Sequence, residues 1–194
     1  MNLSRHNASR RRLIKAGVVG ATALIFPFAG DATRLLTHDS SRAATRSRSR
    51  ELYFYNLHTR ETLRTVYFEN GAYVPKALRQ VDYFFRDFRV NEVKAIDPAL
   101  LDLLYRIYLA LDTSEPFNLV SGYRSPATNA WLASHSEGVS HHSLHMSGMA
   151  SDINVLGRSL ALLQTVALAM RGGGVGYYPR SGFVHVDVGR VRHW

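Results

Sequence analysis

The chain has 194 residues, enough for one ordinary domain and a short additional segment. Hydrophobic residues make up 46% of it and charged residues 20%, the balance of a globular protein. It has no cysteine, which excludes disulfides, thiolate catalysis and cysteine-held metal sites, so any metal ion would need histidine and carboxylate ligands.

The net charge of +9 comes almost entirely from the first 50 residues. Residues 1–50 carry a net charge of +8, whereas residues 51–194 carry only +1. A surface that follows nucleic-acid phosphates needs its excess of Lys and Arg on the folded domain. The distribution of charge therefore argues against a nucleic-acid partner.

The N-terminal segment has the pattern of an export signal. Three arginines, Arg10 to Arg12, precede Leu13-Ile14-Lys15 and an apolar stretch from Ala16 to Ala29. Paired arginines followed by an apolar residue and a lysine resemble the twin-arginine signal. We predict an export signal over residues 1–32 and a periplasmic location. The alternative, an uncleaved membrane anchor, conflicts with the apolar length, because a span needs about 20 residues.

Residues 33–50 are rich in Ser, Arg and Thr, which predicts a flexible linker. Cleavage of the signal could fall at Gly30-Asp31-Ala32 or at Ser41-Arg42-Ala43. The folded domain is then expected over residues 51–194, without a stable membrane span in the mature protein.

The first half of this domain predicts a hairpin followed by two helices. Residues 52–55 and 63–68 are β-prone runs joined by a polar turn. Apolar residues recur at helical spacing over 75–89, after Pro75, and again over 98–111, after Asp97-Pro98.

The second half mixes short strands and helices. Strands are expected at 118–120, 150–155, 174–178 and 183–188, and helices at 127–135 and 159–171. Because strands and helices do not alternate regularly, the fold class is predicted to be α+β in a single domain.

Histidines and aspartates gather in the C-terminal third and suggest a metal site. A catalytic zinc ion takes three nitrogen or oxygen ligands and keeps one position open. The best candidates are His145, Asp152 and His185. Residues seven apart on a straight strand face opposite ways, so His145 and Asp152 can converge only if the chain turns at Ser147-Gly148. His185 and Asp187 share one face of the last strand.

These motifs resemble a known family of zinc peptidases. The motif Ser143-x-His145-x-x-Gly148-x-Ala150-x-Asp152, followed by Val184-His185-x-Asp187, is similar to D-alanyl-D-alanine peptidases and the hedgehog signalling domain, and most closely to the murein endopeptidase K family. Further segments fit the same resemblance: 56–59, 84–87, 121–125, 173–181 and 192–194. The resemblance implies a domain with a central antiparallel sheet, a catalytic Zn²⁺ and hydrolysis of cross-links between peptidoglycan stem peptides.

The resemblance also implies roles for single residues. His145, Asp152 and His185 would be the zinc ligands, and Arg124 would stabilise the substrate or the developing oxyanion. Related enzymes place an acid or a histidine shortly before the last ligand, but Gly182 and Phe183 stand there. Asp187 is the nearest carboxylate on the same face, so it is named as the base or as an orienter of a ligand. An alternative register makes Asp187 the ligand and His185 the base.

Simpler interpretations and other functions are weighed beside this one. Arg124 could merely close an ion pair, His185 could be an ordinary strand histidine, and Asp152 a turn or cap residue. The leading function is a periplasmic murein endopeptidase that acts during growth or remodelling of the cell wall. The alternatives are a carboxypeptidase that trims a terminal D-residue from stem peptides, and a wall-binding module without catalysis.

Overall fold

The computed structural model describes residues 49–136 and 139–194. The predicted export signal and the predicted linker up to residue 48 lie outside the described residues. In the described part, no helix is long and apolar enough to cross a membrane.

The last two residues of the predicted linker belong to the first strand. Ser49 and Arg50 pair with Glu69 and Phe68 of the second strand. Arg50 is also held by an ion pair with Asp102 at 2.6 Å, and its guanidinium lies 4.2 Å from the centre of the Phe68 ring. These contacts order the chain two residues before the predicted start of the domain.

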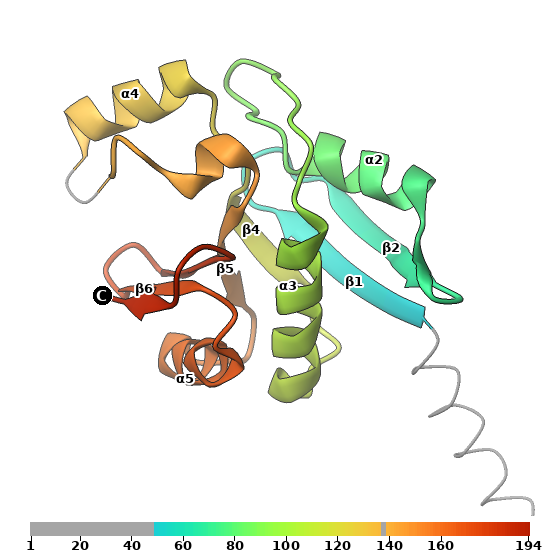
Figure 1. Cartoon of the computed structure of the whole chain (residues 1–194). Helices are drawn as coiled ribbons and strands as arrows, with labels where there is room; N and C mark the ends of the chain where they lie inside the picture. The colour runs from blue at the N-terminus through green and yellow to red at the C-terminus, as the bar shows by residue number, and fades with distance from the viewer. Residues whose placement is uncertain (1–48, 137–138) are drawn as a thin grey trace, which may run out of the picture. The chain divides into compact units, whose positions relative to one another are not determined.

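The fold is α+β, as predicted, and its described residues form one eight-stranded sheet (Figure 1). The strands are β1 (Ser49–Asn56), β2 (Thr62–Glu69), β3 (Ala72–Tyr73), β4 (Phe117–Ser121), β5 (Ala150–Val155), β6 (Gly174–Tyr178), β7 (Phe183–Asp187) and β8 (Arg192–His193). They lie side by side in the order β3-β2-β1-β4-β5-β7-β6-β8.

The sheet is mixed, which corrects the expectation of an antiparallel sheet. Most neighbours are antiparallel, but β1 pairs with β4 and β6 with β8 in parallel. A parallel pair needs a crossover connection, and the chain between β1 and β4 passes through two helices. The chain reverses direction from β6 to β7 and again from β7 to β8, so β8 runs parallel to β6.

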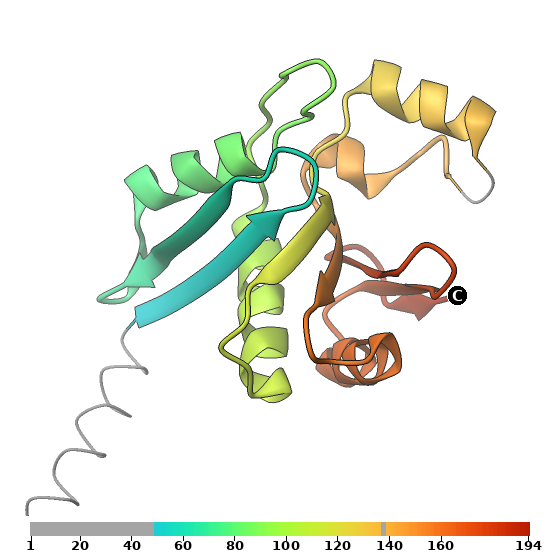
Figure 2. The ribbon, with the colours of Figure 1, turned by 180° about the vertical axis from the view of Figure 1, so that it is seen from behind.

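Helices α2, α3 and α5 pack on one face of this sheet, and the view from behind shows strands β1, β2 and β4 in front of α3 (Figures 1 and 2). The helices are α2 (Pro75–Phe84), α3 (Pro98–Leu111), α4 (Pro126–His135) and α5 (Leu160–Met170), with a 3₁₀ turn, η1 (Leu144–Ser147). The start of α3 follows from its sequence: Asp97 accepts a hydrogen bond from the Ala99 amide, and Pro98 occupies the first turn.

The core lies between α3 and the sheet. Leu100, Leu104 and Ile107 of α3 are fully buried, as are Phe54 of β1 and Phe117 of β4. This pattern matches the apolar stripe predicted for the helix, because residues three and four apart share one helix face.

Helix α2 is shorter than predicted and ends at Phe84 rather than at residue 89. Phe85 leaves the helical conformation (ψ 1°) and is fully buried. Residues 85–92 then form a loop, closed by a bridge between Asp87 and Glu92, which we call the 85–92 loop. The aromatic spacing that predicted a longer helix instead results from packing of this loop.

Candidate metal centre

Three segments bring the predicted ligands together: η1 carries His145, β5 carries Asp152 and β7 carries His185. Gly148 ends η1 in the left-handed conformation (φ 69°), as expected for the turn between the first two ligands. A side chain at Gly148 would also collide with the carbonyl oxygen of Ala95. The turn therefore requires glycine for two reasons.

The strand pairing sets the position of the third ligand. Asp152 lies directly opposite His185 in the antiparallel pair of β5 and β7. Side chains at such opposite positions lie on the same face of the sheet and within contact distance. Although 33 residues separate them in the sequence, the register alone makes them neighbours.

The three side chains converge on one point. Nε2 of His145 lies 3.2 Å from Oδ1 of Asp152 and 3.2 Å from Nδ1 of His185. Nδ1 of His185 lies 2.8 Å from the same Asp152 oxygen. His145 is completely buried, and Asp152 and His185 are 6% and 8% exposed, so two of the three ligands still reach solvent.

The partners on the outer side of each ring determine which nitrogen carries hydrogen. Nδ1 of His145 lies 2.6 Å from the carbonyl oxygen of Gly122, which can only accept, so Nδ1 donates. Nε2 of His185 donates in the same way to the carboxylate of Asp187 at 3.1 Å. In the neutral rings, the two nitrogens that face Asp152 are therefore both acceptors.

Three acceptor atoms that face one another repel unless a cation lies between them, and all three lie within 4.8 Å of one another. Ligands about 2.0–2.1 Å from a tetrahedral zinc ion are separated by about 3.3 Å. The observed separations of 2.8 to 3.2 Å are close to this value. The residues present thus fit a small divalent metal ion of the kind that takes imidazole and carboxylate ligands.

Proton affinities in this cluster are strongly perturbed. Burial lowers the pKa of His145, which favours its neutral, metal-binding form. Burial also acts to raise the pKa of Asp152, but the interactions with His145 and His185 outweigh it and hold that pKa well below its ordinary value. For His185, burial is outweighed by hydrogen bonds with Asp152 and Asp187, so its pKa is raised.

Asp187 lies behind His185 and is fully buried. Besides His185, it accepts hydrogen bonds from the amides of Gly174 and Gly189, both at 2.9 Å. Arg192 donates to both of its oxygens, at 2.8 and 3.1 Å. Burial acts to raise the pKa of Asp187, but these donors outweigh it and keep the carboxylate ionised. This geometry favours the register in which His185 is the ligand and Asp187 its orienter.

The final residues complete the wall behind His185. The Trp194 ring lies 5.3 Å from the His185 ring, and its Nε1 donates to the hydroxyl of Tyr178 at 2.7 Å. A side chain on Gly176 would approach the Trp194 ring to 2.7 Å, and one on Gly174 would collide with Arg192. Two glycines of the 172–176 run are therefore required by the close approach of the last segment.

Arg124 lies beside Asp152, as expected for a residue of the site. Its Nη2 is 3.8 Å from Oδ2 of Asp152, too long for a strong hydrogen bond. The side chain is almost fully buried, and its Nε has no hydrogen-bond partner among the described residues. Burial lowers the pKa of Arg124, yet a guanidinium keeps its charge in proteins. A buried cation with unused donors is ready to receive an anionic group.

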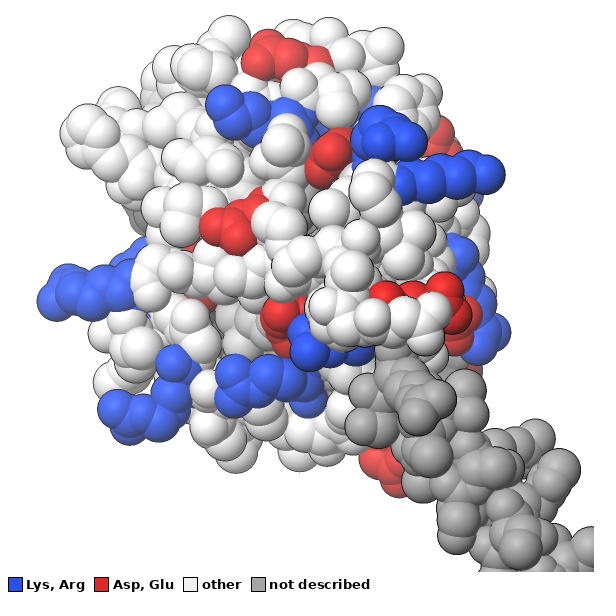
Figure 3. All heavy atoms as spheres, turned by 45° about the vertical axis from the view of Figure 1, so that its right-hand side comes forward, with Lys and Arg blue, Asp and Glu red and all other residues white. Residues whose placement is uncertain are grey.

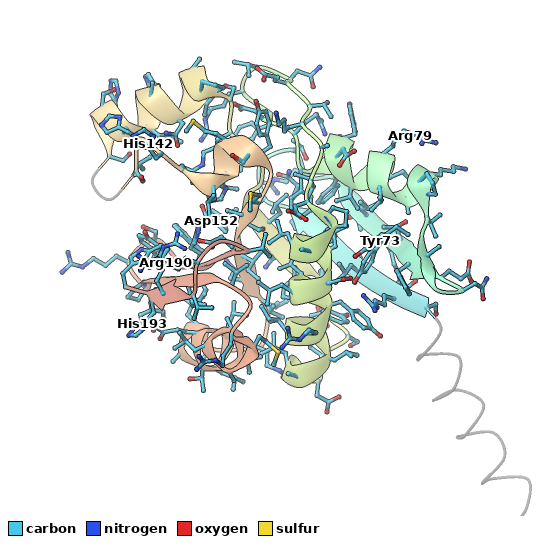
Figure 4. All side chains as sticks on the ribbon, in the orientation of Figure 1. Tyr73, Arg79, His142, Asp152, Arg190 and His193 are labelled. Carbon is cyan, nitrogen blue, oxygen red and sulfur yellow. The ribbon has the colours of Figure 1, made fainter. Side chains whose placement is uncertain are left out.

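A cleft of about 380 Å³ opens onto these residues. Asp152 and His185 form part of its wall, together with His58, Arg89, Arg124, His142, Tyr178 and Trp194. In Figure 4, Asp152 lies between the segment that carries His142 and the strands near Arg190 and His193. A larger hollow of about 480 Å³ between β2 and α2 contains none of the three ligands.

Of the other histidines of the C-terminal third, His142 lines the cleft without being one of the three converging residues, whereas His135 and His193 lie elsewhere. His135 stacks on exposed Trp131 of α4 at 4.6 Å, and His193 is exposed on β8.

Sequence reasoning missed Arg89 as a cleft residue, because its position depends on how the 85–92 loop docks and no spacing rule marks it. The face shown in Figure 3 has Lys and Arg interspersed with Asp and Glu, in keeping with the nearly neutral domain.

Comparison with known proteins gives a consistent result. Residues 43–194 match a peptidase family model described as peptidoglycan L,D-endopeptidase MepK. The chain is 42% identical over 192 residues to the peptidoglycan L,D-endopeptidase MepK of Escherichia coli strain K12, which covers 99% of this chain and 100% of that protein. A Haemophilus influenzae protein named probable peptidoglycan L,D-endopeptidase MepK is 40% identical over 147 residues, 75% of this chain and 78% of its own length.

Proposed function

Because this chain belongs to the MepK family of M15 peptidases, we propose that it is a zinc-dependent endopeptidase that hydrolyses L,D-linked peptide cross-links in peptidoglycan. The names of its relatives support the substrate and the type of bond. The export pattern at residues 10–29 supports action in the periplasm, where the cell wall of Gram-negative bacteria lies.

The observation that carries the proposal is the set of three converging acceptor atoms. His145, Asp152 and His185 would hold the metal ion, and the hydrogen bonds to Gly122 and Asp187 would keep both rings in the ligating form. Two imidazoles, one carboxylate and an open side toward the cleft are the donor set of catalytic zinc sites. When bound, zinc acts as a Lewis acid that polarises a carbonyl group and lowers the pKa of water toward about 7.

Arg124 would supply the second electrostatic element. Its guanidinium lies in the wall of the cleft beside Asp152, with unused donors. As water adds to the scissile carbonyl, negative charge grows on the carbonyl oxygen, and a fixed cation in a desolvated wall stabilises that charge. The weak contact with Asp152 leaves Arg124 free to make this interaction.

Asp187 would act by positioning rather than by moving a proton. Its two oxygens receive hydrogen bonds from four residues, and none of its surface is exposed. A general base must reach the water whose proton it takes, and Asp187 lies behind the ring of His185. We therefore assign it to the orientation of His185.

The test is chromatography of purified muropeptide dimers after incubation with zinc-loaded protein, with chelator-treated protein alongside. We expect L,D-linked dimers to become monomers only when metal is present. His185→Ala should lower kcat/KM by at least about a thousandfold, because it removes a ligand. His193→Ala, which alters an exposed histidine on β8, is the matched control and should leave kcat/KM unchanged.

The products separate the proposal from its alternatives. Intact dimers beside shortened monomers would indicate a carboxypeptidase. Binding to cell-wall sacculi without any hydrolysis, by the wild type and by His185→Ala alike, would indicate a wall-binding module.

A further inference from the structure

The cleft carries more positive charge than the metal centre and Arg124 alone require. Among its described lining residues, three arginines face a single carboxylate, that of Asp152. Arg192 is neutralised by its ion pair with Asp187. Arg89 and Arg124 remain, and both line the cleft. Two neighbouring cations without a shared anion disfavour each other until an anion joins them.

Arg89 is held in place although it is exposed. Its guanidinium lies over the ring of Phe88, 4.4 Å from the ring centre. On this ring His58 is stacked as well, at 4.3 Å and an angle of 15°, and Nε2 of His58 lies 3.0 Å from the carbonyl oxygen of Val120. Stacking on the Phe88 ring does not occupy the N–H groups of the Arg89 guanidinium. Among the described residues, these groups have no ion pair and no side-chain hydrogen bond.

A buried carboxylate couples the two arginines. One oxygen of Asp87 accepts a hydrogen bond from the Arg89 amide at 3.1 Å, and the other accepts from the Ser125 amide at 2.9 Å. Ser125 directly follows Arg124 in the chain. Asp87 is only 1% exposed, so this bridge is shielded from water. It fixes the 85–92 loop against the segment that carries Arg124.

Further contacts make this docking rigid. The amide of Tyr123 donates to the carbonyl oxygen of Phe85 at 2.8 Å, and the Tyr123 hydroxyl donates to Glu92 at 2.5 Å. A side chain on Gly122 would approach the Phe85 oxygen to 2.5 Å, so the two segments can lie this close only with glycine at that position.

We propose that Arg89, on the cleft wall that also carries Arg124, forms a subsite that binds a free carboxylate of the substrate beside the scissile bond, while Arg124 keeps its role toward the scissile carbonyl. This inference rests on the proposed function. In an L,D cross-link, the nitrogen of the scissile amide is bonded to a carbon of D configuration. That carbon also bears a carboxyl group. When this group is free, it is an anion one carbon away from the nitrogen, and guanidinium forks match a carboxylate in geometry and charge. Arg89 then selects cross-links that carry the free acid.

The test compares two dimers that differ in one group: the carboxylate beside the scissile nitrogen is free in one and amidated in the other. Wild-type protein should have a lower KM for the free acid. Arg89→Ala should raise KM for the free acid about tenfold, with kcat within about twofold, and should leave KM for the amide unchanged. Arg89→Lys keeps the charge and should retain more of the preference than Arg89→Ala.

The matched control is Arg190→Ala, which removes an exposed arginine outside the cleft (Figure 4). It should leave both KM values unchanged. Equal KM values of the wild type for the two dimers, or an equal effect of Arg89→Ala on both, would overturn the subsite. Binding of the two dimers to the chelator-treated full chain provides a second measurement. If neither dimer is hydrolysed, the proposed endopeptidase is wrong, while a preference for the free acid that Arg89→Ala abolishes would still support the subsite.

Discussion

The two halves of the sheet, which meet between β4 and β5, bury opposite kinds of side chain. Around β1 and β4 the buried groups are mainly apolar and include aromatic rings, with the ring of Phe54 5.1 Å from Phe85 and 6.1 Å from Phe117. Around β5 and β7, the face opposite the apolar core buries His145, Asp152, His185 and Asp187. Burial of the first set stabilises the fold by about 25 cal/mol per Å² of apolar surface. Burial of the second set costs free energy unless every charge has a partner.

The groups that stabilise the fold and the groups that form the candidate site therefore lie in different parts of one sheet. Each buried charged group of the second set has a named partner, and its three converging acceptor atoms could hold a metal ion. We therefore expect that the apolar half can be weakened without altering the site, and that the site can be altered without removing the core. The following predictions test that separation, beginning with the largest expected effect.

Leu104→Ala should lower the free energy of unfolding by about 2–5 kcal/mol, because Leu104 of α3 is fully buried and its loss leaves a cavity. Metal affinity below the melting temperature should stay unchanged. Urea denaturation followed by circular dichroism, with chelator competition for the metal, measures both quantities. Leu109→Ala, at a half-exposed position of the same helix, is the control and should change stability little. A large loss of metal affinity in Leu104→Ala would show that the two halves are coupled.

Asp187→Asn should lower metal affinity about 10- to 100-fold, because an amide nitrogen facing His185 favours the tautomer with hydrogen on Nδ1, the ligating atom. Competition with a fluorescent chelator measures the change, and circular dichroism checks the fold. Unchanged metal affinity would remove Asp187 from its assigned role. Arg192→Ala acts one step further out, through Asp187, and should have a smaller effect.

The smallest effect expected is on the pH dependence of stability in the metal-free protein. The pKa of His145 is lowered, so stability should rise with pH up to about 6.5, as the unfolded chain releases that proton. The pKa of His185 is raised, so stability should fall above about 6.5, as the folded protein loses its proton. Thermal melts in chelator from pH 5 to 8 should therefore show a maximum.

With metal bound, stability should instead rise above pH 6.5, because protons no longer compete with the metal for the ligands. His185→Ala should abolish the fall in the metal-free protein, and His193→Ala should preserve it. A flat profile for the metal-free wild type would contradict the assigned proton affinities.

Much of the fold could be predicted from the sequence. The helix at 98–111 and the strand at 150–155 have the predicted bounds, because an apolar stripe behind Asp97-Pro98 and a buried β-prone run are strong local signals. The short β8 was missed, since two residues carry no periodicity. The end of α2 was predicted too late in the chain because Phe85, which is buried in a docked loop, stands at the spacing expected of a helix face.

The site was predictable where spacing and a turn residue acted together. Ser147-Gly148 indicated the turn that brings His145 toward Asp152, and the two-residue period of β7 put His185 and Asp187 on one face. The tautomers could not be predicted, because the carbonyl of Gly122 reaches His145 through tertiary contact. The same holds for Arg89, whose place in the cleft depends on the docking of the 85–92 loop through Asp87.

The register that sets Asp152 opposite His185 also bears on the order of events in folding. A chain in which β7 has not yet docked on β5 offers only His145 and Asp152, and two ligands bind zinc weakly. At the proposed metal site, metal capture would therefore follow formation of this strand pair, and bound metal would stabilise the pair in turn. A one-residue slip of β7 would point His185 to the other face of the sheet. Retained metal would thus be a readout of correct strand register, measurable on intact protein without a substrate.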